Sequence, residues 1–180
     1  MHPDCERILL TEEQIKTRVR EVAAQLDKLY EGRKPVVVCI LKGSVVFFVD
    51  LIRAMQSPCE LDFMAVSSYG SGTRSTGELL IKKDLAANIE GRDVLIVEDI
   101  IDSGNTLYHL KKMLNRRRPA SVNIVTLLDK PSRRQVPMEP EYTCFEIEDE
   151  FVIGYGLDYA EDYRNLPYVG VLKRSIYEGK

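Results

Sequence analysis

The chain is organised around one stretch, which reads Val94-Leu95-Ile96-Val97-Glu98-Asp99-Ile100-Ile101-Asp102-Ser103-Gly104-Asn105-Thr106-Leu107. Its first four residues are apolar and mostly β-branched, which is typical of a buried parallel strand. From Leu107 onward apolar residues recur at helical spacing. The acidic turn between these segments lies where α/β sheets bind ligands, outside the carboxyl ends of their strands. We therefore predict an α/β fold with a mostly parallel central sheet, helices on its faces and a ligand site at this junction.

The two halves of the turn differ chemically. The second half consists of the small residues Ser103, Gly104, Asn105 and Thr106. Backbone N–H groups at the start of a helix, helped by two hydroxyls, make a cradle for a phosphate. The first half carries Glu98, Asp99 and Asp102, which would repel a phosphate and must face sugar hydroxyls, a divalent cation or a basic nitrogen. A phosphorylated sugar satisfies both halves.

Three other known kinds of acidic or glycine-containing turn can be compared with this one. An acidic turn followed by a helix cap at Ser103 or Asn105, with nothing bound, fits the composition. A calcium-binding EF-hand loop does not fit, because the carboxylates do not fall at the alternate positions that it requires. A Walker loop does not fit either, because no Gly-Lys-Ser/Thr follows.

Residues 98–106 resemble the phosphoribosyl-pyrophosphate (PRPP) motif of type I phosphoribosyltransferases, in the form of their hypoxanthine–guanine branch. Some of these enzymes carry Lys or Arg where this chain has Asn105. The resemblance implies a purine-salvage enzyme that joins hypoxanthine or guanine to PRPP, forming a nucleotide and releasing pyrophosphate. It also implies a small hood, built from the chain ends, over the carboxyl edge of the sheet.

A second strand–turn–helix unit follows residues 35–41, with Lys42 and Gly43 in its turn. On its own it is also compatible with a structural turn and a surface lysine. The resemblance makes it a pyrophosphate-binding loop with a cis peptide between Leu41 and Lys42. Residues 69–78 are rich in Gly, Ser and Thr, so they read as a plain hairpin loop or as a lid over the substrate.

The resemblance supplies the remaining contacts. Ser68 and Tyr69, at the hinge of the lid, and Arg164 are implied to bind pyrophosphate. In the base site, Lys130 is implied to bond the exocyclic oxygen of a 6-oxopurine, Phe151 to stack on the purine and the Val152 backbone to read its edge. Asp158 is implied to face the magnesium–pyrophosphate and to border the purine.

These roles give a chemical expectation. Glu98 and Asp99 would hold the ribose hydroxyls, directly or through Mg²⁺, so that Glu98, Asp99 and Asp158 are the expected metal residues. Asp102 would act as the general base for the purine ring nitrogen. Lys42 and Arg164, together with Mg²⁺, would stabilise the leaving pyrophosphate.

Composition sets broader limits. The 180 residues are enough for one compact domain, which we place at residues 1–180, and the net charge of −3 gives no general argument for nucleic acid or an anionic membrane. The N-terminus shows no apolar signal region, and no window approaches a membrane span. Four scattered cysteines without a C-x-x-C pair favour a reduced, cytoplasmic setting.

Two rival functions stay open at this point. Some proteins with the phosphoribosyltransferase fold bind RNA as regulators, and the basic cluster between Lys111 and Arg118 is compatible with that. The purine-reading residues Lys130, Phe151 and Asp158 argue against it, so we expect no nucleic-acid partner. The second rival is a xanthine-preferring enzyme. We expect a homodimer or a homotetramer, although the sequence does not fix the oligomeric state.

Overall fold

The computed structural model describes residues 1–68 and 79–178. Its main element is a six-stranded sheet in the order β4 (Leu79–Lys83), β3 (Glu60–Ser68), β2 (Val36–Ile40), β5 (Asp93–Ile101), β6 (Ser121–Asp129) and β7 (Tyr142–Glu146). All neighbouring strands are parallel except β3 and β4, which pair antiparallel. The predicted fold class, a mostly parallel sheet with flanking helices, is confirmed; that residues 1–180 form one domain stays a prediction.

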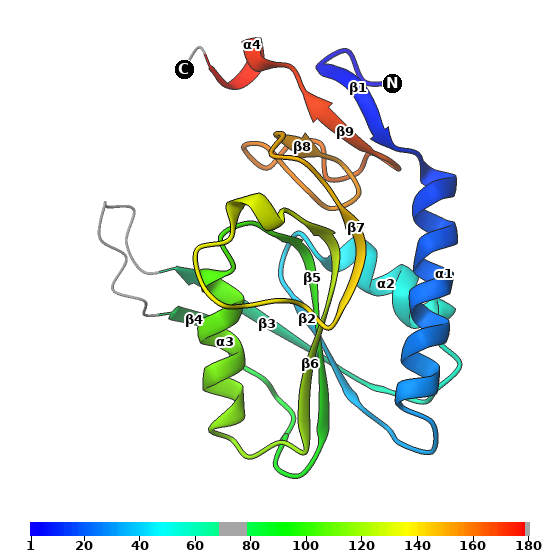
Figure 1. The fold of residues 1–180 in the computed structure, drawn as a ribbon, viewed down its shortest axis with the longest axis vertical. Helices are drawn as coiled ribbons and strands as arrows, with labels where there is room; N and C mark the ends of the chain where they lie inside the picture. The colour runs from blue at the N-terminus through cyan, green and yellow to red at the C-terminus, as the bar shows by residue number, and fades with distance from the viewer. Residues whose placement is uncertain (69–78, 179–180) are drawn as a thin grey trace.

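Helices cover both faces of the sheet, with α1 (Glu12–Leu29) and α2 (Val45–Ala54) on one side and α3 (Asn105–Asn115) on the other (Figure 1). This arrangement explains why all five residues of β2 are buried. Val37 and Cys39 point into the core beneath α1 and α2, whereas Val36 and Val38 point into the core beneath α3. The two central strands, β2 and β5, are therefore packed on both faces, which fixes the carboxyl edge of the sheet where the site lies.

The sequence signal at the start of α1 is confirmed. Thr11 is the N-cap, its side chain accepts a hydrogen bond from the Gln14 amide, and the Gln14 side chain accepts one from the Thr11 amide. None of the helices in the described part of the chain is both long and apolar enough to cross a membrane.

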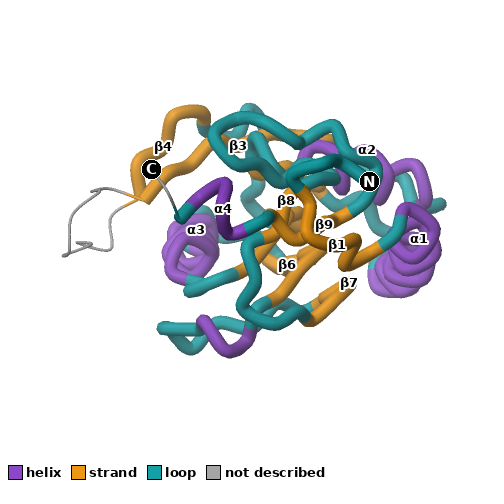
Figure 2. The backbone as a smooth tube through the Cα atoms, turned by 90° about the horizontal axis from the view of Figure 1, so that it is seen from above, coloured by secondary structure: helices purple, strands orange, loops and turns teal. Residues whose placement is uncertain are grey.

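A separate three-stranded antiparallel sheet forms the hood, in the order β1 (Cys5–Leu10), β9 (Val169–Leu172) and β8 (Val152–Ile153). It lies beyond the carboxyl edge of the large sheet and joins strands from near the two ends of the chain, β1 and β9 (Figures 1 and 2). Two short helices, η1 (Pro131–Arg133) and α4 (Arg174–Tyr177), lie in the same half of the molecule. The hood implied by the resemblance is therefore present.

One boundary differs from the sequence prediction. The strand predicted for residues 94–97 continues to Ile101, so that Glu98 and Asp99 belong to β5 and not to the turn. The reason is that Ile100 and Ile101 still pair with Leu128 and Asp129 of β6. Both carboxylates are consequently fixed by a strand, and the turn proper begins at Asp102.

Candidate active site

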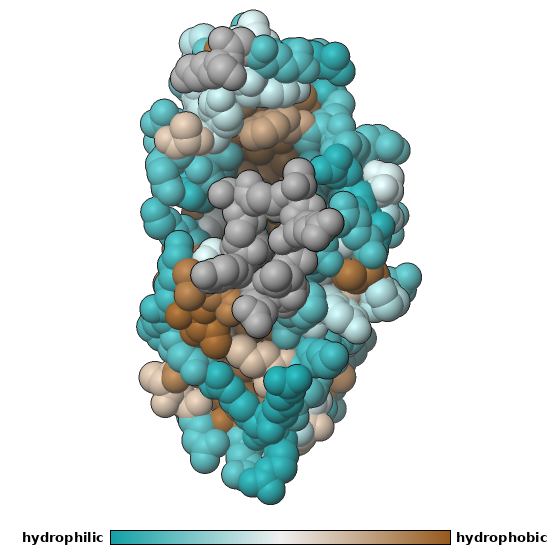
Figure 3. All heavy atoms as spheres, turned by 90° about the vertical axis from the view of Figure 1, so that its left-hand side faces the viewer, coloured by the Kyte–Doolittle hydropathy of each residue, from teal (hydrophilic) through white to brown (hydrophobic). Residues whose placement is uncertain are grey.

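Two neighbouring cavities lie at the carboxyl edge. The first, of about 400 Å³, is lined by the end of β5, the turn before α3 and the loop after β2. The second, of about 520 Å³, lies under the hood. They share the lining residues Asp99, Ile100, Asp102 and Asp158. Seen from the side of α3, the surface is hollowed below the hood, and apolar side chains lie in the hollow (Figure 3).

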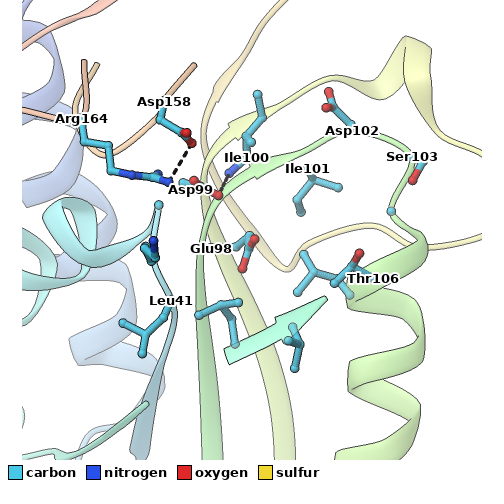
Figure 4. Close-up of a pocket in the computed structure, with 16 residues that line it drawn as sticks. Leu41, Glu98, Asp99, Ile100, Ile101, Asp102, Ser103, Thr106, Asp158 and Arg164 are labelled. Atoms are coloured by element: carbon cyan, nitrogen blue, oxygen red, sulfur yellow. Dashed lines mark hydrogen bonds and ion pairs between the residues drawn. The ribbon is translucent and has the colours of Figure 1, made fainter. Parts of the chain in front are cut away.

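The predicted phosphate turn lines the first cavity through Ser103, Gly104 and Thr106 (Figure 4). Gly104 is the N-cap of α3 and has a φ of +78°, a conformation that favours glycine. Because Gly104 has no side chain, nothing of its own caps the helix amides. The side chain of Asn105 is held by Gln135, whose Oε1 accepts a hydrogen bond of 3.0 Å from Asn105 Nδ2.

The two carboxylates of β5 point in different directions, Glu98 toward α3 and Asp99 toward Arg164 (Figure 4). Glu98 Oε2 is buried and has no hydrogen-bond partner among the described residues. Burial, followed by the neighbouring charge of Asp99, raises the pKa of Glu98 well above its ordinary value of 4.5. Burial also raises the pKa of Asp99, although its Oδ1 accepts a hydrogen bond of 2.8 Å from the Ile100 amide. Such shielded oxygens suit hydroxyl or cation partners.

The loop after β2 approaches Asp99 closely. A Cβ atom at Gly43 would lie 1.6 Å from Asp99 Oδ2, so only glycine fits at this position. The peptide between Leu41 and Lys42 is cis, as the resemblance implies. Gly156 in turn packs on Gly43, since a Cβ at Gly156 would lie 2.0 Å from the Gly43 carbonyl oxygen.

The two predicted pyrophosphate cations meet at one carboxylate that the sequence reading missed. Glu161 lies 3.1 Å from Lys42 Nζ and 3.2 Å from Arg164 Nη2. Both partners lower the pKa of the Glu161 carboxyl, and the hydrogen bond from Lys42 has the larger effect. Arg164 also pairs with Asp158 at 2.9 Å and donates to the Gly156 carbonyl at 2.8 Å. An anion therefore already sits between the two cations.

The second cavity brings the predicted base-reading residues together. Lys130 is only 7% exposed, and its Nζ lies 3.2 Å from Asp102 Oδ1 and 3.7 Å from Asp149 Oδ1. Phe151 and Val152 line the same cavity, Phe151 with 39% exposure and Val152 buried. The four residues predicted to contact the base, Lys130, Phe151, Val152 and Asp158, therefore line one cavity.

The sequence analysis also did not identify Arg134 and Gln135, which lie beneath the phosphate turn. Arg134 forms an ion pair with Asp129, and its Nη1 donates a hydrogen bond of 2.6 Å to the Asp102 carbonyl. The Gln135 amide donates to the Ser103 carbonyl at 3.0 Å. A Cβ at Gly104 would lie 2.8 Å from Arg134 Cδ, so the stem of this arginine packs directly against the turn. No local pattern marks Arg134, because its role depends on contacts across the fold.

The remaining predicted residues are placed as follows. Ser68 is the last residue of β3, opposite Leu79 of β4, while Tyr69 and the predicted lid at residues 69–78 lie outside the described residues. In the basic cluster, Lys111 pairs with Glu141, Arg117 with Asp84 and Arg118 with Glu90. Much of its charge is therefore neutralised by neighbouring acids, which gives a nucleic-acid interface little support.

The mostly parallel sheet, the hood and the acidic strand end before a helix-starting turn define an α/β protein with a candidate ligand site at the carboxyl edge of the sheet. The profile described as the phosphoribosyl transferase domain matches residues 7–160. The chain belongs to this phosphoribosyltransferase family and is an enzyme of it.

Curated relatives and solved structures agree with this assignment. The hypoxanthine-guanine phosphoribosyltransferase of Streptococcus thermophilus is 51% identical over 98% of both chains, and that of Bacillus subtilis is 51% identical over 99% of both. The bifunctional protein TilS/HprT of Listeria innocua is 53% identical, but this chain spans only 27% of its length. A crystal structure of a hypoxanthine phosphoribosyltransferase from Staphylococcus aureus superposes with a TM-score of 0.95 at 52% identity, covering 98% of this chain and 96% of that one.

Proposed function

We propose that this phosphoribosyltransferase transfers the 5-phosphoribosyl group of PRPP to hypoxanthine or guanine, forming IMP or GMP and pyrophosphate in purine salvage. The observation that carries the proposal is the pair of adjoining cavities, one with the phosphate turn and one with Lys130 and Phe151. Because Asp99, Ile100, Asp102 and Asp158 line both, a sugar in the first cavity and a base in the second would meet beside Asp102.

The first cavity supports the sugar-phosphate half. The amides of residues 103–106 would bind the 5-phosphate at the start of α3. The fixed carboxylates Glu98 and Asp99 would hold the ribose hydroxyls. The pyrophosphate would bind beside Lys42, Gly43 and Arg164, which line this cavity. The family resemblance suggests Ser68 and Tyr69 as further contacts.

The second cavity supports the base half. An ammonium has three donors and no acceptor, so Lys130 can bond the oxygen of a 6-oxopurine but would repel the amino group of adenine. Phe151 offers an aromatic face, and Val152 lies beside it to read the base edge. Asp102 lies against Lys130 and would take the proton from the purine ring nitrogen.

The residues fit Mg²⁺ as a cofactor. Magnesium is usually held by one or two carboxylates together with substrate phosphates rather than by a cage of protein ligands. The described residues contain no group of three or more His, Cys, Asp or Glu side chains placed to hold a metal ion by themselves, so any Mg²⁺ would need ligands from the substrate. Glu98, Asp99 and Asp158 line the first cavity, and the orphaned Glu98 Oε2 gives a cation or a hydroxyl a reason to bind. When bound, Mg²⁺ would neutralise charge on the pyrophosphate.

The chemistry follows from the charges of these residues. Breaking the bond between the anomeric carbon and the pyrophosphate oxygen leaves positive charge on the ribose and negative charge on the leaving group. Fixed carboxylates beside the sugar and fixed cations beside the pyrophosphate oppose both charges, which is electrostatic catalysis by groups already in place. The new bond joins the anomeric carbon to a purine ring nitrogen, whose proton passes to Asp102.

The setting of the enzyme is part of the proposal. All four cysteines lie in the described residues and none forms a disulfide, which supports a reducing, cytoplasmic environment. We propose a homodimer or a homotetramer, with PRPP, 6-oxopurines, their nucleotides and pyrophosphate as partners, and neither membrane nor nucleic acid.

The decisive experiment is a set of steady-state assays with PRPP and each of hypoxanthine, guanine, xanthine and adenine. Turnover of hypoxanthine or guanine, with adenine nearly inactive, supports the proposal; preference for xanthine would move the assignment to the xanthine-preferring enzyme.

The same assays over a range of free Mg²⁺ test the cofactor. We expect a chelator to abolish activity and excess Mg²⁺ to restore it. Tight, salt-sensitive RNA binding without purine turnover would instead favour the regulator.

A further inference from the structure

The second cavity contains an aromatic residue that none of the motifs includes. Tyr177, the last residue of α4, lines this cavity together with Phe151. The two rings stack with their centroids 4.8 Å apart and an angle of 22° between their planes. Tyr159 meets Phe151 nearly at right angles, with the centroids 5.6 Å apart. Phe151 is therefore held by two other rings.

The position of Tyr177 is fixed by the hood. Ile176 and Tyr177 pack against the small buried cluster of Cys5, Ile153 and Leu172, which joins the three hood strands. The chain enters α4 through Lys173, whose amide donates a hydrogen bond of 2.9 Å to the Asp4 carbonyl near the opposite end of the chain. Tyr177 thus reaches the cavity from an anchored helix and not from a free end.

We infer that Tyr177 is a positioning residue of the base cavity, which covers one face of Phe151 and leaves the other face for the base. This rests on the proposed purine function. Phe151 is 39% exposed, so the ring stacked on it contributes a large part of the contacts that orient its plane. Ile100 lines the same cavity, so a flat base would lie between Ile100 and the free face of Phe151. Without Tyr177, Phe151 would keep only the edge contact with Tyr159 and would lose the ring stacked on its face.

The test compares Tyr177→Ala and Tyr177→Phe with the wild type in steady-state assays that vary the purine and PRPP separately. Tyr177→Ala should raise KM for hypoxanthine and guanine about 3- to 10-fold, as expected from the loss of an aromatic pair. KM for PRPP should stay unchanged, because the phosphate turn is untouched. Tyr177→Phe keeps the stacked ring and should behave as the wild type. Direct binding adds a second readout: affinity for GMP falls in Tyr177→Ala, whereas affinity for ribose 5-phosphate does not.

The outcomes separate this inference from the proposed function. If the wild type does not use 6-oxopurines, the proposed function fails. If the wild type is active and purine KM is unchanged in Tyr177→Ala, Tyr177 has no part in base binding. A lower purine KM would mean that Tyr177 covers the face that the base needs, which also overturns the inference. Should Tyr177→Ala not fold, Tyr177→Leu, which fills the space without a ring, decides by the same criteria.

Discussion

Nζ of Lys130 lies 3.2 Å from Oδ1 of Asp102, so the residue proposed to read the base and the residue proposed to take its proton form an ion pair. Lys130 is buried, whereas the Asp102 side chain is 49% exposed. A 6-oxopurine that bonds Lys130 would compete with Asp102 for the ammonium. Recognition of the base oxygen would then release the carboxylate for proton transfer.

We predict that Asp102→Asn lowers kcat by about 10²- to 10⁴-fold, the usual contribution of a placed proton acceptor. Asparagine can still accept a hydrogen bond from Lys130, so PRPP affinity should be largely retained. Asp149→Asn is the matched control, because it also removes a carboxylate near Lys130, at 3.7 Å, but not the proposed base. Loss of PRPP binding at unchanged kcat in Asp102→Asn would show that Asp102 binds the sugar or the metal.

Lys130→Gln should reduce kcat/KM for hypoxanthine and guanine while KM for PRPP changes little. The reason is that the buried ammonium is the donor for the 6-oxygen, and a site built on such a bond discriminates strongly. Lys42→Gln serves as the control at the other end of the site, where KM for PRPP should rise instead. Comparable kcat/KM values for adenine and hypoxanthine in the wild type would contradict the role of Lys130.

Glu161→Gln should lower KM for PRPP and the inhibition constant of pyrophosphate about 2- to 5-fold, in keeping with the small free energies of exposed ion pairs. The Glu161 carboxylate pairs with both Lys42 and Arg164, so pyrophosphate must replace it. Asp162→Asn removes the same charge one residue away and should have little effect. A higher KM for PRPP in Glu161→Gln would show that this carboxylate assists binding.

Glu98→Gln should raise the Tm of the ligand-free protein at neutral pH while lowering activity. Burial raises the pKa of Glu98 in the folded protein, so the folded protein binds the proton of the Glu98 carboxyl more tightly than the unfolded chain does. The free energy of unfolding contributed by Glu98 therefore falls as the pH rises from the ordinary pKa of 4.5 through the raised value. Thermal unfolding of both proteins between about pH 4 and 8 tests this. The variant's advantage should shrink toward pH 4, and Glu6→Gln, which removes an exposed carboxylate, is the matched control.

Gly104→Ala should destabilise the fold and weaken phosphate binding, and Gly91→Ala is its matched control. Both glycines have a positive φ, +78° and +70°. A Cβ at Gly104 would lie 2.8 Å from Arg134 Cδ, whereas one at Gly91 would meet nothing within 4 Å. Gly91→Ala should therefore cost only the backbone strain, about 1–2 kcal/mol, and leave KM for PRPP unchanged. Equal losses of stability and unchanged PRPP binding in both variants would contradict the packing against Arg134.

The sequence predicts the parallel sheet and the phosphate turn because both depend on local patterns. A β-branched apolar run, small residues and helical spacing follow one another within residues 94–114, and the structure keeps that order. The predicted end of β5 is four residues too early, because polar side chains at the end of a strand resemble those of a turn. Only pairing with β6, far along the chain, shows that Glu98 and Asp99 are still in the strand.

Residues whose roles come from contacts across the fold could not be predicted. Glu161 meets Lys42 from 119 residues away, and Tyr177 stacks on Phe151 only because the hood is closed. Arg134 stands in a basic pair that looks like ordinary surface until Asp129 and the Asp102 carbonyl are placed beside it. The base-reading roles of Lys130 and Phe151 came from family resemblance, since an isolated lysine or phenylalanine carries little information of its own.

The pairing of β1 with β9 has a consequence for the newly made chain on the ribosome. β1 lies at one end of the sequence, yet its hydrogen-bonding partner is residues 169–172. The strand that leads into the phosphate turn, β5, and its two neighbours in the sheet, β2 and β6, are complete by Asp129 and can assemble first. The hood has to wait for the last strand to emerge. During synthesis the part of the site proposed to bind sugar phosphates should therefore fold before the cavity proposed to bind the base.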